Sequence, residues 1–357
     1  MTEQHPHWPT VEPKQLSRLR RESLLLEAAA LGKGLNTMRI SPWGFTAGLA
    51  PRCAGLAFHG TINQETSRSA VRTDDDRLMA KTALTEAQLR VPQSRRFGYK
   101  DVNEALQYAL RFRRGAIIKP RMSGSGRISS KALTAPEQIR QAIESWGEVT
   151  GTHATYLVER RMFSREYSFV IVAGEVISTG RRRNRRWESE VTSVHPEVLD
   201  LAVQAFSAFP AMPHAEVRMF CHDPFAGPEG CVVASVSPEI GLISVHKPRE
   251  WSTRVAEQLI DHSARHLAAR SSAPGREITA VFTMNELSDP EAMTRGIKHW
   301  MGQYQVVGSA SSGDRIVTGQ ITGTPGVLVT LSGLAKAGKL SQESPQTITL
   351  DQQEFAR

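Results

Sequence analysis

The stretch AIIKPRMSGSGRISS, residues 116–130, runs from a short apolar segment that ends at Lys119 into a loop of small and cationic residues. The apolar segment is typical of a strand, and the Gly/Ser run is typical of a flexible loop. Glycine permits close approach of the backbone, and exposed N–H groups with a positive local field favour an anion. The pattern therefore fits a loop that covers phosphates, although an ordinary turn that happens to follow a lysine fits it as well.

The chain of 357 residues is long enough for two or three domains, and its 40% apolar and 22% charged content is typical of a globular protein in water. No apolar run reaches the roughly 18 residues that a membrane span needs. The N-terminus lacks the basic-then-apolar pattern of a secretion signal. We therefore expect a cytoplasmic protein with no membrane partner.

A net charge of +8 and a pI near 9.6 favour anionic partners, which include nucleotides, acidic metabolites and nucleic acid. Cys53, Cys221 and Cys231 are widely spaced, which fits reduced structural thiols better than a disulfide framework. Cys221-His222-Asp223 with Cys231 contains no CxxC pair, so zinc at this place is not expected.

The first 70 residues divide into two parts. Residues 1–14 are rich in His, Pro and Glu, which predicts a disordered tail. Helical spacing then begins at Gln15 and stops at Gly32 or Gly34, either of which can adopt the left-handed cap. The apolar segments NTMRI and PRCAGLAFHG follow. Residues 15–70 are expected to form an N-terminal α/β domain.

Residues 71–270 alternate between helical and strand-like patterns. Asp74–Asp76 can begin a helix that runs to Leu89, and the capping-box patterns that start at Asp101 and Thr134 predict two more helices. The segments TYLVERRM, REYSFVIVAGEVIST, AEVRMFCH and GCVVASVS are strand-like, with a turn at Ala173-Gly174. The segment HPEVLDLAVQAFSAF, between the second and third of these strand-like segments, is expected to be a helix. Another helix is expected from near Pro248 to Arg270.

The last part begins with SSAPG, residues 271–275, which has the composition of a linker. Residues 276–357 are expected to form a small separate α+β domain. It would contain a strand EITAVFTM, a helix capped by Ser288, and further strands such as DRIVTGQI and GVLVTLSG.

The order of these parts resembles the ATP-grasp ligases. A lysine at a strand end, a Gly/Ser loop, a helix and then YLVERRMFSREYSFVIVAGEVIS occur in the same order in relatives of cyanophycin synthetase, glutathione synthetase and D-alanine–D-alanine ligase. The resemblance covers roughly residues 35–265. It implies an α/β (α+β) fold: an ATP-grasp domain at 71–270 with a lid subdomain at about 112–158, placed between the N-terminal unit and the appended C-terminal domain.

The resemblance implies ATP as a cofactor and a residue set that would bind it. Lys119 matches the lysine that contacts the nucleotide phosphates, and Arg77 stands where many members have a second lysine. Glu159 matches the acid beside the adenine, where the backbone from Leu157 to Arg160, Val158 included, would bond the base edge. Glu166 matches the acid that accepts from the ribose hydroxyls. The phosphate-covering loop is matched by Ser123, Gly124, Ser125 and Gly126.

Magnesium is the second cofactor that the resemblance implies, yet its ligands are not matched. Family members carry an acid on one strand and an acid-x-Asn pair on the next, where this chain has Arg218, Ser235 and Ser237. A register two residues different would bring Glu216 or Glu239 to these positions. Glu216 and Arg218 lie on one face of a strand, so such a shift would keep the acid correctly oriented.

The segment TGRRRNRRWESE, residues 179–190, is unusually basic. Relatives have a basic residue in this segment that binds the acyl phosphate or the acceptor carboxylate, so we expect a catalytic role for Arg183. Arg218, at the position of the expected metal-holding acid, is the second residue for which we expect a catalytic role. The segment fits an anion-binding loop over the site, or simply a solvated loop. Nucleic acid is not an expected partner, because aromatic residues apart from Trp187 are missing from the segment.

The resemblance implies an ATP-dependent carboxylate–amine ligase that forms an amide or peptide bond through an acyl phosphate. Its partners would be a small carboxylate and an amine, either amino acids or peptides, with assembly into a homo-oligomer as a further possibility. Two alternatives remain open. One is a catalytically degenerate ATP-grasp protein that binds nucleotide for regulation or as a scaffold. The other is a nucleic-acid-binding protein that uses the Arg-rich loop.

Overall fold

The structure is a computed structural model of the chain. The residues it describes are 18–48, 55–123, 133–150, 155–183, 186–189, 193–242, 249–265 and 277–352. The chain divides into two compact units, residues 1–64 with 241–357, and residues 65–240. The strand pairs in both units are antiparallel, as an α+β fold requires. Among the described residues, none of the helices has the length and apolar content to cross a membrane.

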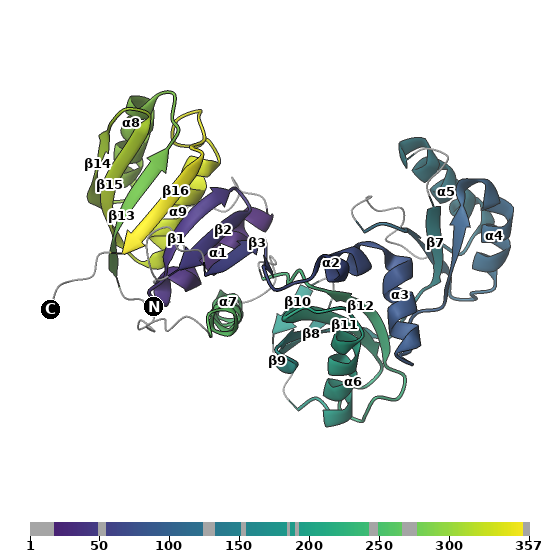
Figure 1. Ribbon diagram of the computed structural model, residues 1–357. Helices are drawn as coiled ribbons and strands as arrows, with labels where there is room; N and C mark the ends of the chain where they lie inside the picture. The colour runs from purple at the N-terminus through teal and green to yellow at the C-terminus, as the bar shows by residue number, and fades with distance from the viewer. Residues whose placement is uncertain are drawn as a thin grey trace. The chain divides into compact units, whose positions relative to one another are not determined.

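The first unit is built on one eight-stranded sheet that both ends of the chain supply, in the order β14-β15-β13-β16-β1-β2-β3-β4 (Figure 1). The strand β1 pairs with β16, with Thr37 opposite Leu350. The strands are β1 (Asn36–Ser41), β2 (Gly44–Gly48), β3 (Leu56–His59), β4 (Ile62–Asn63), β13 (Ile278–Asn285), β14 (Val307–Ser312), β15 (Ile316–Gly323) and β16 (Thr347–Gln352).

This sheet corrects the expected division into an N-terminal domain at 15–70 and a separate C-terminal domain at 276–357. Strands of both segments share hydrogen bonds and one core, so they are parts of a single unit. The sequence pattern could not show this, because the pairing joins residues that are some three hundred positions apart. The proposed linker at 271–275 and the tail at 1–14 lie outside the described residues.

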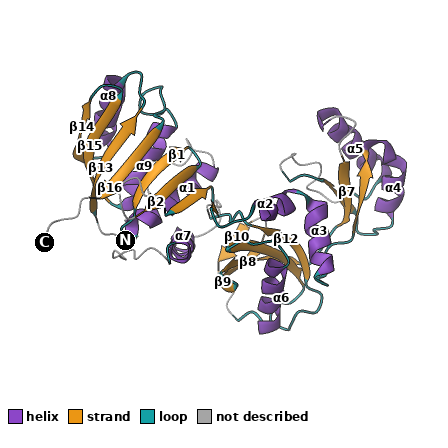
Figure 2. Ribbon diagram, in the orientation of Figure 1, coloured by secondary structure: helices purple, strands orange, loops and turns teal. Residues whose placement is uncertain are grey.

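Helices of the first unit cover the sheet, as Figure 2 shows by colour. Helix α8 packs on β14 and β15, and α9 packs on β1, β15 and β16 as well as on α1, which also contacts α7. The helices are α1 (Arg18–Gly32), α7 (Arg249–Ser263), α8 (Pro290–Gln303) and α9 (Pro325–Lys336). Gly34, with φ 81°, adopts the expected left-handed conformation after α1.

Helix α9 corrects the prediction of a strand at GVLVTLSG. Its β-branched residues are typical of a strand, but Pro325 favours a helix start, and an apolar run buried all round suits a helix in the core. Gly333 lets α1 approach closely, since a Cβ there would lie 2.8 Å from Leu24. The cap of α8 also differs from the prediction: Asp289, not Ser288, accepts the Ala292 N–H at 2.8 Å.

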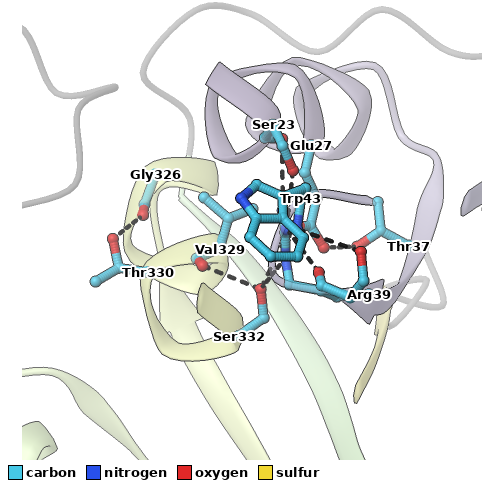
Figure 3. Close-up of polar contacts among 10 residues, drawn as sticks. Ser23, Glu27, Thr37, Arg39, Trp43, Gly326, Val329, Thr330 and Ser332 are labelled. Carbon is cyan, nitrogen blue, oxygen red and sulfur yellow. Dashed lines mark hydrogen bonds and ion pairs between the residues drawn. The ribbon is translucent and has the colours of Figure 1, made fainter. Parts of the chain in front are cut away.

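A buried ion pair joins α1, β1 and α9 inside the first unit (Figure 3). Arg39 and Glu27 are both 0% exposed, and the Arg39 Nε donates to Glu27 Oε2 at 2.8 Å. The hydroxyls of Ser23, Thr37 and Ser332 complete the hydrogen bonds around the pair. One cation therefore faces one carboxylate, and hydroxyls together with the carbonyls of Ser23 and Ser41 form the remaining hydrogen bonds.

The second unit contains a five-stranded sheet in the order β10-β9-β8-β11-β12 (Figure 1). Helix α6 packs on β8, β9, β11 and β12, while α2 and α3 pack on β12. The elements are α2 (Arg68–Asp75), α3 (Arg77–Glu86), β8 (Arg165–Val172), β9 (Glu175–Arg183), β10 (Arg186–Ser189), α6 (Pro196–Ser207), β11 (His214–Cys221) and β12 (Val232–Ser237). The predicted turn at Ala173-Gly174 is confirmed: both residues have positive φ between β8 and β9.

A smaller three-stranded sheet, in the order β5-β7-β6, completes the second unit. Its elements are β5 (Ser94–Gly98), the 3-10 turn η2 (Tyr99–Asp101), α4 (Val102–Leu110), β6 (Ala116–Pro120), α5 (Pro136–Thr150) and β7 (Thr155–Arg160). Asp101 does not cap α4 as predicted; its carboxylate instead accepts the Gly98 N–H at 2.8 Å. The strand β6 is the one whose lysine precedes the Gly/Ser loop.

Candidate functional site

Three cations surround one buried carboxylate between α3, β6 and β7. The side chain of Glu159 is 4% exposed; its Oε1 accepts from Lys119 Nζ at 2.6 Å, and its Oε2 from Lys81 Nζ at 2.9 Å. Arg77 also interacts electrostatically with Glu159. We call Arg77, Lys81, Lys119 and Glu159 the cationic cluster. Its formal charge is two units positive, because three cations face one anion.

The local sequence explains how α3 brings its cations to β6. Asp76 caps α3 by accepting from the N–H groups of Leu78 and Met79, and it also binds the guanidinium of Arg121 just after β6. Arg77 NH1 donates to the Pro120 carbonyl at 2.7 Å. The start of α3 is thereby fixed to the end of β6, and Lys81 follows one turn later on the same helix face.

The electrostatics of the cluster follow from burial among like charges. Burial lowers the pKa of Lys81 and of Arg77, and Glu159 offsets part of that effect for each. Burial on its own would raise the pKa of Glu159, but Lys119 and Lys81 hold it below its usual range. The cluster would therefore gain from a further anion, which would relieve the repulsion among the cations.

The expected phosphate loop is described only at its beginning. Ser123 donates its N–H to the Asp75 carbonyl at 2.7 Å and its hydroxyl to the Asp75 carboxylate at 3.1 Å. Gly124, Ser125 and Gly126 lie outside the described residues. The loop is thus anchored at its first residue to the end of α2.

The backbone around Val158 is already in use. Because β7 is the central strand, Val158 is paired with Arg95 of β5 on one side and with Ile118 of β6 on the other. Two residues further on, the Arg160 amide donates to the Gln93 carbonyl at 2.8 Å. These pairings run against the expectation that this backbone would bond an adenine edge. The Glu159 side chain, expected beside the adenine, instead forms ion pairs with Lys81 and Lys119.

The positions expected to hold a metal do lie together, as cross-strand pairs of β11 and β12. Arg218 is opposite Ser235, and Glu216 is opposite Ser237. Glu216 is buried, and its carboxylate accepts from Ser168 Oγ at 2.6 Å and from Arg218 NH2 at 3.0 Å. Glu216 raises the pKa of Arg218, which therefore stays charged.

Asp74, at the end of α2, joins this group of residues. Its Oδ2 accepts from Ser237 Oγ at 2.7 Å, and it interacts electrostatically with Arg218. Burial raises the pKa of Asp74 to about 6; the Ser237 hydrogen bond works against this rise, while Asp75 and the exposed Glu239 add to it. The acid is thus insufficiently neutralised by its surroundings.

This residue set does not fit magnesium. A cation and two hydroxyls stand at the implied positions, whereas magnesium prefers anionic and carbonyl oxygens. Glu216 is already engaged by Arg218 and Ser168. In the described part of the chain, no three His, Cys, Asp or Glu side chains come together as metal ligands. Cys221 and Cys231 are buried free thiols, while Cys53 lies outside the described residues.

The two remaining predicted residues lie on β8 and β9. Glu166 accepts from Arg182 NH1 at 2.7 Å, so the acid expected to bind ribose is held by a neighbouring arginine. Arg183 pairs with Arg186 in the β9–β10 ladder, but its side chain lies outside the described part of the structure.

Sequence reasoning missed two members of these groups. Lys81 has no expected role from the sequence, although its position one turn after Arg77 places it on the same helix face. Asp74 was taken as a helix-capping acid because three consecutive aspartates precede α3. Its contact with Ser237, 163 positions later, leaves no local signal.

Solved structures of ATP-grasp ligases are similar to this chain. They include PsnB in complex with the precursor peptide PsnA2 and AMPPNP (16% identity, 55% of this chain and 60% of that chain, TM-score 0.40). The bifunctional glutathione synthetase of Pasteurella multocida matches with 13% identity over 70% of this chain and 44% of that chain, at a TM-score of 0.45. D-alanine–D-alanine ligase of Bacillus anthracis, complexed with ATP, matches with 14% identity over 56% and 69%, at a TM-score of 0.44.

These solved structures belong to the family of ligases that the sequence resembles, and their TM-scores lie between 0.40 and 0.45. This chain spans only 60% of the length of PsnB and 44% of the length of the glutathione synthetase. The activities of those proteins therefore do not establish the reaction of this chain. No family model and no curated protein matches the chain.

Proposed function

We propose that residues 65–240 bind ATP at the cationic cluster and that the protein is an ATP-dependent carboxylate–amine ligase. The observation that carries this proposal is the surplus of two positive charges around Glu159. A purely structural use of Glu159 would require one cation. Lys119 at the end of β6, which leads into a Gly/Ser loop, and two cations of α3 beside it form an arrangement suited to phosphate oxygens.

In this proposal the chain supplies positioning and charge neutralisation. Lys119, whose side chain is 33% exposed, would reach the phosphates, while Lys81 and Arg77 would maintain the positive field behind it. A substrate carboxylate oxygen would attack the γ-phosphorus, ADP would leave, and an acyl phosphate would form. An amine would then attack the acyl carbon, so that phosphate leaves, an amide forms and one proton is released.

Isothermal titration calorimetry with ATP tests the first half of the proposal. We expect binding by the wild-type protein, weakened in Lys81→Met but unchanged in Lys33→Met. Lys33 is a suitable control because it too binds a carboxylate, Asp261, but in the other unit. If the wild-type protein binds no nucleotide at millimolar concentration, the proposal is wrong. Phosphate release with a panel of amino acids and peptides tests the ligase reaction.

A second candidate is nucleotide binding without turnover. Arg218 stands where a metal-holding acid was expected, and its ion pair with Glu216 holds the guanidinium group there. An arginine can replace the charge of a metal ion but does not bridge two phosphates as magnesium does. ATP binding without phosphate release by any carboxylate–amine pair would favour this candidate.

A further inference from the structure

An exposed surface of the second unit combines arginines with a phenylalanine, and no part of the proposed ligase reaction uses it. It consists of Arg113, Arg114, Arg160, Arg161 and Phe163, which we call the arginine–phenylalanine surface. All five side chains are exposed. The sequence contains no Asp or Glu between Glu104 and Glu137, nor between Glu159 and Glu166.

The fold brings the two segments of this surface together. The residues before β6 and those after β7 lie at the same end of the three-stranded sheet, because Ala116 is opposite Arg160 in the antiparallel ladder. The Arg161 N–H donates to the Gly115 carbonyl at 3.3 Å, which fixes the two connections side by side. The exposed arginines thus come from two chain segments that are more than forty positions apart, and Arg114 of one segment and Arg161 of the other lie over the same ring.

Phe163 is the aromatic centre of the surface. It is 50% exposed, and the guanidinium carbons of Arg161 and Arg114 lie 4.7 Å and 5.3 Å from its ring centroid. Within the described part of the chain, no carboxylate forms an ion pair with the four arginines. A half-exposed ring close to cations from both segments offers an aromatic face beside positive charge.

We infer that the arginine–phenylalanine surface binds single-stranded nucleic acid. Guanidinium groups bind phosphate oxygens through paired N–H donors, and an exposed aromatic ring stacks on any base. The Arg-rich segment at 181–186 offered no interleaved aromatic residue before Trp187, whereas here the fold supplies one. A duplex would fit less well, because its bases are stacked on each other and leave the ring without a partner.

An acidic peptide is the competing occupant, since carboxylates also bind guanidinium groups. The exposed phenylalanine favours nucleic acid, because stacking of a base uses the ring face while a carboxylate does not. The two occupants therefore differ in how strongly they depend on Phe163, and that difference is measurable.

The test uses the full-length protein and fluorescein-labelled oligo(dT) and oligo(U) of 20 nucleotides, with binding followed by fluorescence anisotropy. We expect the oligonucleotides to bind. A plot of the logarithm of the association constant against the logarithm of salt concentration should have a slope of about −3, as about four neutralised phosphates predict for a single strand. The Phe163→Ala variant should bind about tenfold or more weakly, which is the scale for losing one stacked base. In the Arg114→Gln/Arg161→Gln variant the slope should be shallower by about 1.4, because two phosphate contacts are lost.

Matched controls lie elsewhere in the chain. Phe225→Ala removes another half-exposed phenylalanine of the same unit, and Arg295→Gln/Lys298→Gln removes two exposed cations of the other unit. Neither control should change binding. The inference is wrong if the oligonucleotides do not bind, or if the surface variants bind as the controls do. Tight binding of a polyglutamate peptide that ignores Phe163→Ala would assign the surface to an acidic peptide instead. Circular dichroism of each variant verifies folding.

Discussion

The two units of this protein each bury a carboxylate, and they neutralise it differently. Glu27 in the first unit faces one arginine, both side chains are 0% exposed, and hydroxyls and backbone carbonyls form the remaining hydrogen bonds. Glu159 in the second unit faces two lysines with Arg77 nearby, and Lys119 remains 33% exposed. A balanced, closed pair serves the fold, whereas a surplus of partly accessible cations is suited to a ligand.

The comparison predicts its largest effect at Glu27. We expect Glu27→Gln to lower the free energy of unfolding of the first unit by about 3–5 kcal/mol, because Arg39 would keep its charge without a buried counter-ion. Urea denaturation measures this change. ATP affinity should not change, since Glu27 lies in the other unit. A loss of ATP binding in a variant that remains folded would contradict the contrast between the two carboxylates.

Asp74 extends the comparison to a carboxylate with too little neutralisation. Its folded-state pKa of about 6 lies above the ordinary value of 3.8, so the folded protein binds the proton more tightly than the unfolded chain does. Its contribution to stability is therefore present at low pH and is lost as the pH rises from about 4 to 6, by up to about 3 kcal/mol. Asp74→Asn should remove this loss.

Urea denaturation at pH 4.5 and pH 7.5 checks the Asp74 prediction. The difference in free energy of unfolding between Asp74→Asn and wild type should favour the variant more at pH 7.5 than at pH 4.5. The reason is that wild type loses the Asp74 proton between these two pH values and the variant has no such proton. Asp200→Asn serves as a control, since Asp200 is an exposed acid on α6 in the same unit. Parallel pH profiles of wild type and Asp74→Asn would show that Asp74 is not the group responsible.

Lys119 tests the other side of the contrast. We expect Lys119→Ala to weaken ATP binding by about 1–3 kcal/mol, the scale of a hydrogen bond to a charged group. The melting temperature should change little, because Lys81 still neutralises Glu159. Calorimetric titration and a thermal melt measure the two quantities. A large fall in melting temperature with unchanged ATP affinity would make Lys119 a structural residue like Arg39.

The smallest effect is expected at the β11–β12 pairs. Arg218→Asp with Ser235→Glu and Ser237→Asn would place new acids beside Glu216, which only a cation could then neutralise. Magnesium at millimolar concentration should raise the melting temperature of this triple variant by a few degrees and leave that of wild type nearly unchanged. Strong stabilisation of wild type by magnesium would place the metal ligands elsewhere.

Local sequence patterns predicted most features of the second unit. The lysine at the end of β6, the aspartates before α3, the turn at Ala173-Gly174 and the strands β11 and β12 all follow from residues close in sequence. The family resemblance, rather than a local pattern, implied that Arg218, Ser235 and Ser237 lie together, and the β11–β12 ladder supplied the register that the sequence left open by two residues. The β-branched segment of α9 was misjudged because burial on every side overrides strand propensity.

The sequence by itself determined the periodicities, the strand–lysine–loop order and the surplus of positive charge, because each of these is a property of neighbouring residues. The tertiary structure alone decided which distant groups meet. It joined β1 to β16 in one sheet, placed Lys81 beside Glu159 and Asp74 beside Ser237, and set Phe163 among arginines of two segments. The physical reason is that ion pairs, strand pairs and ring contacts act over a few ångströms in space, whatever the separation along the chain.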